Sequence, residues 1–327
     1  MVHIPQGAFF VGDKDTLALD YAAFYQSDNK ENPAGLYHIN SEAEIEVGKQ
    51  KGQLYYPSRN DYRGDQLGPI PPSFPKGYDA FYCMKYEITQ GQYAAFLNAI
   101  PDQASHFRAN FGGKHYYENR GTISLQGDSY VAASPQRPLN YVSWDDGCAF
   151  ADWAGLRPMT ELEFTKACRG PVDPVAHEYP WGSSSKTGVL RYVNTETDEL
   201  TMAPGLDESQ LSDQNKEAFA ASYYWVMDLA GSVWEKVITI GHPTGRSFEG
   251  SHGDGRISTY GFAQNPDWPR GNEEQGGYGY RGGGYYEHGK AAGAFNPHSP
   301  VAYRPFGSWA GGPRSIAYGF RCVRSAD

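Results

Sequence analysis

The segment DLAGSVWEKV, residues 228–237, places two acidic side chains on either side of a glycine-containing turn. Asp228 and Glu235 supply carboxylate oxygens, and the backbone carbonyls of Gly231 and Val233 lie between them. Several hard oxygen ligands on one loop form the donor set that calcium prefers. We therefore predict a structural Ca²⁺ ion at Asp228, Gly231, Val233 and Glu235. The alternative is a packed turn that binds no metal.

A second set of residues with binding chemistry lies near the C-terminus. Tyrosine and tryptophan give a large contact area at low entropic cost, and glycine lets the backbone approach a ligand closely. The predicted ligand-binding residues are Tyr285, Tyr286, Glu287, His288, Asn296, His298, Tyr303, Arg304, Phe306 and Trp309. The alternative is that about half of the aromatic side chains here fill the protein core. Trp309 and Phe320 fit that alternative best.

Other motifs do not lead to a site. GYGYRG, residues 277–282, matches the glycine pattern of a dinucleotide-binding loop, but no helix pattern follows it and no acidic residue stands at the required distance. The sequence contains no Walker loop, no G-x-S-x-G and no H-E-x-x-H. The widely spaced cysteines include no C-x-x-C, which argues against zinc. Buried thiols, or one disulfide with two free thiols, are both open for Cys83, Cys148, Cys168 and Cys322.

The composition predicts a globular protein with much irregular backbone. The 327 residues include 39 Gly, 22 Pro and 25 Tyr, and few segments show a long helical period. The formal net charge of -10 argues against nucleic acid as a partner. No stretch approaches the roughly 18 apolar residues of a membrane span. The opening residues, MVHIPQGAFFVGD, show no signal-peptide features.

Three stretches predict the start of a helix, because a Ser or Thr is followed three residues later by Gln, Asp or Glu. They are Thr89 with Gln92, Ser143 with Asp146 and Thr160 with Glu163. The second helix should end at Gly155 and the third at Gly170. One face of the first helix carries the apolar side chains of Tyr93, Phe96, Leu97 and Ile100.

Strand patterns occur in residues 1–13 and 78–88, which are rich in alternating and aromatic residues. The polar residues between them, 14–78, are interpreted as a long insertion. Beyond residue 171 the sequence consists of turns and short strand candidates.

Seven segments, taken in order, resemble the formylglycine-generating enzyme family, also called the sulfatase-modifying factor domain. They are HIPQGAFFVG (3–12), FYCMKYEITQGQYAAFLN (81–98), PLNYVSWDDGCAFADWAGLRPMTELEFTKACRG (138–170), YPWG (179–182), DLAGSVWEKV (228–237), RGGG (281–284) and YGFRCV (318–323). The resemblance covers nearly the whole chain. It implies an α+β, C-type-lectin-like fold in one domain, residues 1–327, with a polar insertion at about 14–78 and a ligand-binding C-terminal segment, 281–321.

The resemblance also bears on the predicted metal. The family positions that match Asp228, Gly231, Val233 and Glu235 bind a structural calcium ion. Ser232 replaces the usual Asn and Lys236 the usual second Trp, and neither change removes a proposed ligand.

The catalytic members of the family bind copper(I) through two cysteines that follow the RGG segment, because this soft ion requires sulfur ligands. From Arg281 to Phe320 this sequence has no cysteine. The resemblance therefore implies a branch without the copper site, and we expect neither copper nor iron. Two enzymatic alternatives stay open: a relative of the pyoverdine-maturation protein, and a divergent metal-dependent oxidoreductase with a site around Glu287, His288 and His298.

The resemblance implies that Cys322 forms a disulfide with a cysteine on the second predicted helix. The family position matches Ala151, but Cys148 lies one turn earlier on the same helical face. We predict a Cys148–Cys322 bond, which would place the protein in an oxidising, extracytoplasmic compartment.

Together these features predict a non-catalytic bacterial binding protein with a protein or glycan ligand. Retroelement-diversified variable proteins are a special case, because they place their variable residues in the same segment, upstream of a Gly-Phe-Arg ending. A structural component of a bacterial surface or secretion assembly is the remaining alternative.

Overall fold

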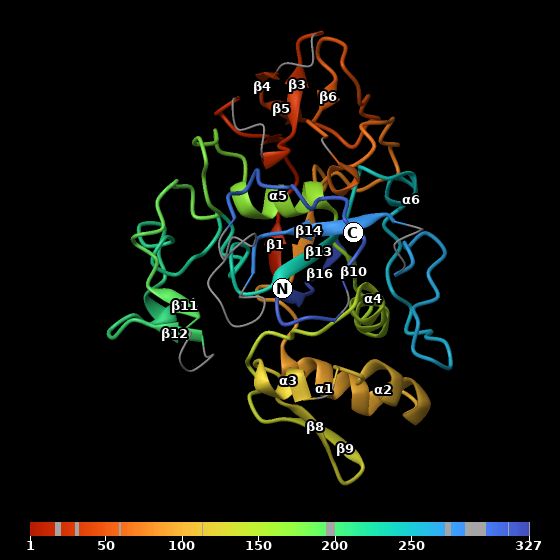
Figure 1. The fold of residues 1–327 in the computed structure, drawn as a ribbon. Helices are drawn as coiled ribbons and strands as arrows, with labels where there is room; N and C mark the ends of the chain where they lie inside the picture. Colours follow the sequence, from red (N-terminus) through yellow and green to blue (C-terminus); the bar gives the residue numbers. More distant parts are fainter. Residues whose placement is uncertain are drawn as a thin grey trace.

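The computed structural model describes residues 1–16, 21–29, 33–58, 60–112, 114–193, 200–271, 276–284, 299–312 and 314–326 (Figure 1). Its helices are α1 Gln90–Ala99, α2 Asp102–Arg108, α3 Lys114–Glu118, α4 Trp144–Trp153, α5 Glu161–Arg169 and α6 Pro243–Arg246. Its strands are β1 Val2–Ile4, β2 Phe9–Val11, β3 Tyr25–Ser27, β4 Pro33–Gly35, β5 Tyr37–Ile39, β6 Leu54–Tyr55, β7 Phe81–Cys83, β8 Ile123–Gln126, β9 Ser129–Ala132, β10 Arg157–Pro158, β11 Arg191–Val193, β12 Leu200–Met202, β13 Trp234–Ile238, β14 Tyr278–Arg281, β15 Tyr318–Gly319 and β16 Cys322–Ser325.

All three predicted capping boxes are present. At the start of α1, α4 and α5 the cap hydroxyl accepts from the backbone N–H three residues on, and that residue's side chain accepts from the cap backbone. The apolar face of α1 is buried as predicted, with Tyr93 and Phe96 fully enclosed. α5 ends at Gly170, whose φ of 68° is a left-handed conformation that favours glycine. α4 ends at Trp153, two residues before Gly155.

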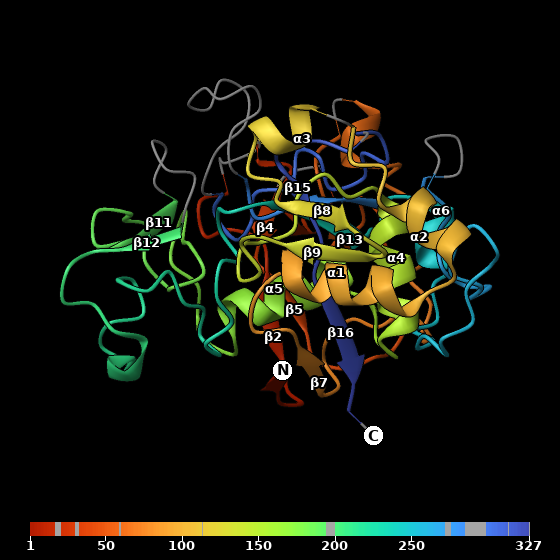
Figure 2. The same ribbon diagram turned by 90° about the horizontal axis from the view of Figure 1, so that it is seen from below.

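Two small sheets form the centre of the molecule. One has the order β1-β7-β16-β10, and the other has the order β14-β13-β15. The antiparallel pairing of β7 with both β1 and β16 brings the two ends of the chain together, as both ribbon views show (Figures 1 and 2). In Figure 1, α5 lies on one side of these strands and α1 to α3 lie on the other.

The region predicted as a polar insertion, residues 14–78, contains the sheet β4-β3-β6 as well as β5, which pairs with β2. It forms the upper, red-to-orange part of Figure 1. Several of its side chains lie in the main hydrophobic cluster, among them Phe24, Tyr56, Ile70 and Phe74. The region therefore supplies core residues in addition to surface loops.

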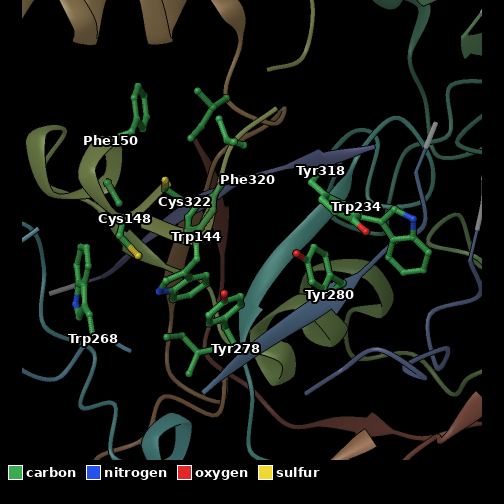
Figure 3. Close-up of a cluster of buried hydrophobic side chains, with 14 of the residues drawn as sticks. Trp144, Cys148, Phe150, Trp234, Trp268, Tyr278, Tyr280, Tyr318, Phe320 and Cys322 are labelled. Carbon is green, nitrogen blue, oxygen red and sulfur yellow. The ribbon is translucent and has the colours of Figure 1, made fainter. Parts of the chain in front are cut away.

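The core is strongly aromatic (Figure 3). Trp144 at the start of α4 stacks on Tyr278 of β14, with ring centroids 4.4 Å apart and planes 6° from parallel. Phe320 packs against Trp144 at 5.4 Å and is fully buried, as the sequence predicted. These contacts join α4 to β14 and to the end of the chain.

The predicted Cys148–Cys322 bond is absent from the structure. All four cysteines belong to the described residues, and each is a buried free thiol. Cys148 and Cys322 lie in the same core cluster (Figure 3), but as two separate side chains. Cys148 belongs to α4 and Cys322 to β16, and each thiol is enclosed by the core without a bond to the other.

No described helix has the length and apolar character that crossing a bilayer requires.

Candidate ligand-binding site

The C-terminal segment, residues 281–321, begins at the end of β14, which pairs with β13 through Glu235 and Arg281. Six predicted ligand-binding residues lie outside the described part of the chain: Tyr285, Tyr286, Glu287, His288, Asn296 and His298. The four that the structure places are Tyr303, Arg304, Phe306 and Trp309.

Arg304 does not present its charge to a ligand, so this part of the prediction is wrong. Its side chain is 1% exposed, and its Nε donates to Oε2 of Glu161 at 2.9 Å. A further N–H donates to the Ala22 carbonyl at 3.2 Å. The guanidinium lies over the rings of Phe24 and Tyr56, at 4.3 and 4.4 Å from their centroids. Arg304 therefore attaches the segment to the body of the protein.

Glu161, the first residue of α5, pairs with two arginines of the C-terminal segment, Arg281 and Arg304. Besides Arg304, its carboxylate faces the guanidinium of Arg281 at 3.4 Å. It also accepts from the Thr239 hydroxyl at 2.9 Å and the Ile240 N–H at 3.0 Å. A buried carboxylate needs such partners, because leaving it unpaired is costly. Arg281 and Arg304 are thus both paired with the first residue of α5.

The three aromatic side chains among these four residues combine structural and surface roles. Phe306 lies edge-on to Trp234 at 5.8 Å, and Trp309 packs near Tyr280 at 5.4 Å. Tyr303, Phe306 and Trp309 are all partly buried against the main core. The alternative that some of these residues fill the core is therefore correct in part, but each keeps exposed surface.

A pocket of about 490 Å³ opens where this segment meets the 14–78 region. Its aromatic walls are Tyr62, which is 44% exposed, and Trp309, with ring centroids 5.6 Å apart. Its polar lining includes Asp65, His242 and Ser308.

The polar groups of the pocket are held by neighbours. Asp65 forms two 2.9 Å hydrogen bonds with Arg246 of α6. His242 caps α6, because its Nδ1 accepts from the Thr244 N–H at 3.2 Å. A neutral imidazole that accepts at Nδ1 carries its proton on Nε2. Burial lowers the pKa of His242, which favours this neutral form.

Close backbone contact forms the floor of the pocket. Gly64 has a φ of 110°, and a Cβ there would lie 2.7 Å from the Cα of Gly241 and 2.9 Å from the Ser308 hydroxyl. Only glycine allows the loop of the 14–78 region to approach the end of β13 this closely.

The sequence did not identify Tyr62, Asp65 or His242 as members of a site. Tyr62 and Asp65 belong to one segment and His242 to another, which begins shortly before α6. Asp65 and its α6 partner Arg246 are 181 positions apart, and neither segment carries a motif. Only the fold brings them to Trp309. The one local signal was Pro243 at the first turn of α6, which marks His242 as a helix cap.

The turn predicted to hold calcium is as tight as expected, since Asp228, Gly231 and Ser232 have φ angles of 61°, 99° and 59°. Its carboxylates already have cationic partners. Asp228 accepts from Arg191, and Glu235 accepts from Arg321 at 2.7 and 2.9 Å.

A third carboxylate, Glu87, lies 3.7 Å from Arg321, and its oxygens lack a hydrogen-bond partner among the described residues. Burial is the main cause that raises the pKa of Glu87 to about 8, and the negative charge of the nearby Asp228 adds to the rise. Within the described ranges no group of three His, Cys, Asp or Glu residues could hold a metal ion. With these ion pairs in place, a calcium ion would have to displace Arg191 and Arg321 from the carboxylates.

Comparisons with known proteins are consistent with this architecture. The family model of the sulfatase-modifying factor enzyme 1-like domain matches residues 43–326. Formylglycine-generating enzyme from Bos taurus is 24% identical over 181 residues, 48% of each protein. Hercynine oxygenase from Mycolicibacterium thermoresistibile is 38% identical over 71 residues, 21% of this chain and 16% of that protein. The matches span about half, or less, of the length of these curated relatives.

Two solved structures are also similar. PvdO from Pseudomonas aeruginosa has a TM-score of 0.43 and 15% identity, with 99% of this chain and 93% of that chain covered. Treponema denticola variable protein 1 has a TM-score of 0.40 and 13% identity, with 93% of this chain and 99% of that chain covered. The match of the family model over residues 43–326 decides the assignment: the chain belongs to the sulfatase-modifying factor enzyme 1-like domain family and has its α+β, C-type-lectin-like fold.

Proposed function

We propose that this chain is a binding protein that holds a protein or glycan ligand in the pocket between Tyr62 and Trp309. The observation that carries the proposal is the pocket itself, about 490 Å³ in volume with two aromatic walls. This size lies within the range of roughly 300–1,000 Å³ that is typical of ligand sites.

The pocket lining favours a ligand with flat apolar faces and several hydrogen-bonding groups. The rings of Tyr62 and Trp309 can cover a sugar ring or an apolar peptide side chain. The Asp65 carboxylate and the Ser308 hydroxyl accept hydrogen bonds, and the Nε2–H of His242 is a donor. Both sugars and extended peptides present such groups.

Buried ion pairs and close backbone packing support the pocket. Arg304 and Arg281 fix the segment to Glu161, and Gly64 packs directly on Gly241. A site that is already ordered loses less conformational entropy when it binds.

The cysteines support a role other than copper oxidation. Copper(I) sites need thiolates, and no cysteine lies between Arg281 and Phe320. Burial raises the pKa of Cys83 to about 12 and raises the pKa of Cys148, Cys168 and Cys322 as well. These thiols are therefore protonated at neutral pH. The enzymatic alternative, a metal site around Glu287, His288 and His298, is tested below by metal analysis.

Three further parts of the proposal stay predictions. The first is an extracytoplasmic location. The second is a calcium ion at Asp228, Gly231, Val233 and Glu235, which would require the arginines to release the carboxylates. The third is sequence variability of the segment. Sequencing the gene from many isolates tests the third, because substitutions concentrated in residues 285–309 would confirm it and a uniform spread would contradict it.

The binding proposal is tested by screening the protein on glycan and peptide arrays, followed by hydroxyl-radical footprinting with the best ligand. We expect the ligand to reduce oxidation of Tyr62 and Trp309. Tyr82, which is 40% exposed on β7, is the matched control and should not change. Protection confined to another surface would overturn the assignment of the site.

A further inference from the structure

Asp15, His177 and Tyr21 form a continuous chain of polar contacts outside the Tyr62–Trp309 pocket. The Nε2 atom of His177 lies 2.9 Å from Oδ2 of Asp15, and its Nδ1 atom lies 3.2 Å from the hydroxyl of Tyr21. An ionised carboxylate can only accept, so Nε2 carries a proton. In the neutral imidazole Nδ1 is then the acceptor, and the Tyr21 hydroxyl donates to it.

The backbone of His177 provides an independent observation. Its φ of 57° is a left-handed conformation that is uncommon for residues other than glycine. The backbone N–H of His177 lies 3.2 and 3.0 Å from the two carboxylate oxygens of Asp13, which hold this conformation. Such conformations occur preferentially at functional sites. Here it aims the imidazole at both Asp15 and Tyr21.

The chain of contacts lies against the C-terminal segment. The Tyr21 ring is edge-on to His177 and to Tyr303, at 5.5 Å from each. The backbone N–H of Arg304 donates to the backbone carbonyl of Tyr21 at 2.8 Å. The side chains of His177 and Asp15 are 41% and 36% exposed, and Tyr21 is partly buried, so part of the site faces solvent.

We propose that Tyr21 is a nucleophile activated by His177 and Asp15, and that it reacts with neutral, activated acyl groups. The Tyr21 oxygen attacks the carbonyl carbon while its proton passes to Nδ1 of His177. The carbonyl then re-forms and the leaving group departs with the ester's bonding electron pair, which gives an acyl-tyrosine. His177 passes the proton to the leaving group or to water. A base oriented by a carboxylate and hydrogen-bonded to a nucleophile is the general arrangement of such sites.

The charges around Tyr21 select the substrate class. Asp13 and Asp15 both lie on this side of the molecule, so an anionic electrophile such as a phosphate ester is repelled and a neutral ester is not. Among the residues that the structure describes, His177, Tyr179 and Tyr303 are further titratable groups near Tyr21. Burial is the main cause that raises the pKa of Tyr21, and the negative charge of Asp13 adds to it. The resting hydroxyl is therefore protonated, and a base must take its proton during the attack.

The experiment treats the intact protein with p-nitrophenyl acetate and measures acetylation of each tyrosine by peptide mass spectrometry. Tyr82 is the matched control, because it is an exposed tyrosine with a histidine neighbour, His3, in ring contact at 5.2 Å. General-base assistance should make Tyr21 react at least about tenfold faster than Tyr82.

The variant His177→Asn removes the base but keeps a residue that tolerates left-handed backbone. It should lower the Tyr21 rate to that of Tyr82, with circular dichroism and the melting temperature unchanged. Asp15→Asn, which leaves the His177 backbone untouched, should lower the rate by a smaller factor. A Tyr21 rate equal to that of Tyr82 in the wild type would overturn the proposal, as would a rate that is the same in a folded His177→Asn or Asp15→Asn variant.

Discussion

Arg304 and Glu161 form a buried ion pair between residues 143 positions apart, with Nε and Oε2 separated by 2.9 Å. The side chains are 1% and 0% exposed. Together with the pair between Arg281 and Glu161, this contact joins the C-terminal segment to the start of α5. It explains why an arginine within an aromatic, glycine-rich segment is a structural residue.

Replacing Arg304 with methionine should therefore lower the free energy of unfolding. The change leaves the Glu161 carboxylate with fewer partners inside the protein, and removing one member of a buried pair costs about 3–5 kcal/mol. Urea denaturation measures the loss. Arg256→Met is the control, since Arg256 is 85% exposed and its pair with Asp254 should be worth less than about 1 kcal/mol. Similar losses in the two variants would contradict the role given to Arg304.

Local features of the fold could be predicted because they depend on neighbours in the sequence. The capping boxes at Thr89, Ser143 and Thr160 involve residues three positions apart, and all three are present. The end of α5 at Gly170 and the burial of Phe320 were predicted for similar reasons. Aromatic and glycine content indicated a fold with little regular structure.

Features that depend on distant partners could not be predicted. Nothing near Arg304 in the sequence shows that Glu161 will lie beside it, so the arginine was interpreted as a surface residue. The pocket joins Tyr62 to His242 and Trp309 through packing alone. The His177 contacts with Asp15 and Tyr21 arise in the same way. Six of the predicted binding residues, among them Tyr285 and His288, lie outside the described part of the chain.

The buried amine of Lys166 should make the stability of the protein depend on pH. Its Nζ donates to the carbonyls of Gly7 at 2.7 Å and Tyr78 at 3.2 Å, and burial lowers its pKa from 10.5 to about 8. Between these values the unfolded chain keeps the proton and the folded protein has lost it. Unfolding then takes up a proton, so the contribution of Lys166 to stability increases as pH rises from about 8 to 10.5.

The variant Lys166→Met lacks this titration. The unfolding free energy of the wild type minus that of Lys166→Met should be constant below about pH 8 and should increase above it. Urea denaturation at a series of pH values provides the comparison, and the values below pH 8 are the internal control. A value of this signed difference that decreases as the pH rises would show that the pKa shift has the opposite sign.

Metal analysis distinguishes the binding protein from a metal-dependent oxidoreductase. For protein purified without chelator, we expect no stoichiometric copper or iron by elemental mass spectrometry. Stoichiometric amounts of either metal would contradict the proposed function and would direct attention to Glu287, His288 and His298. The same measurement reports calcium: about one ion per chain, lost in Glu235→Gln, would confirm the predicted calcium site.

The most direct test of the account is the affinity of the best array ligand for the wild type and for Tyr62→Ala. Tyr62 is 44% exposed, so its removal should leave the fold intact while it deletes one wall of the pocket. Aromatic residues at the centre of a binding site contribute at least about 1–2 kcal/mol, so we predict a loss of affinity of roughly tenfold or more. Tyr82→Ala should bind as the wild type does. Equal affinity of the wild type and Tyr62→Ala would contradict the central claim that this pocket holds the ligand.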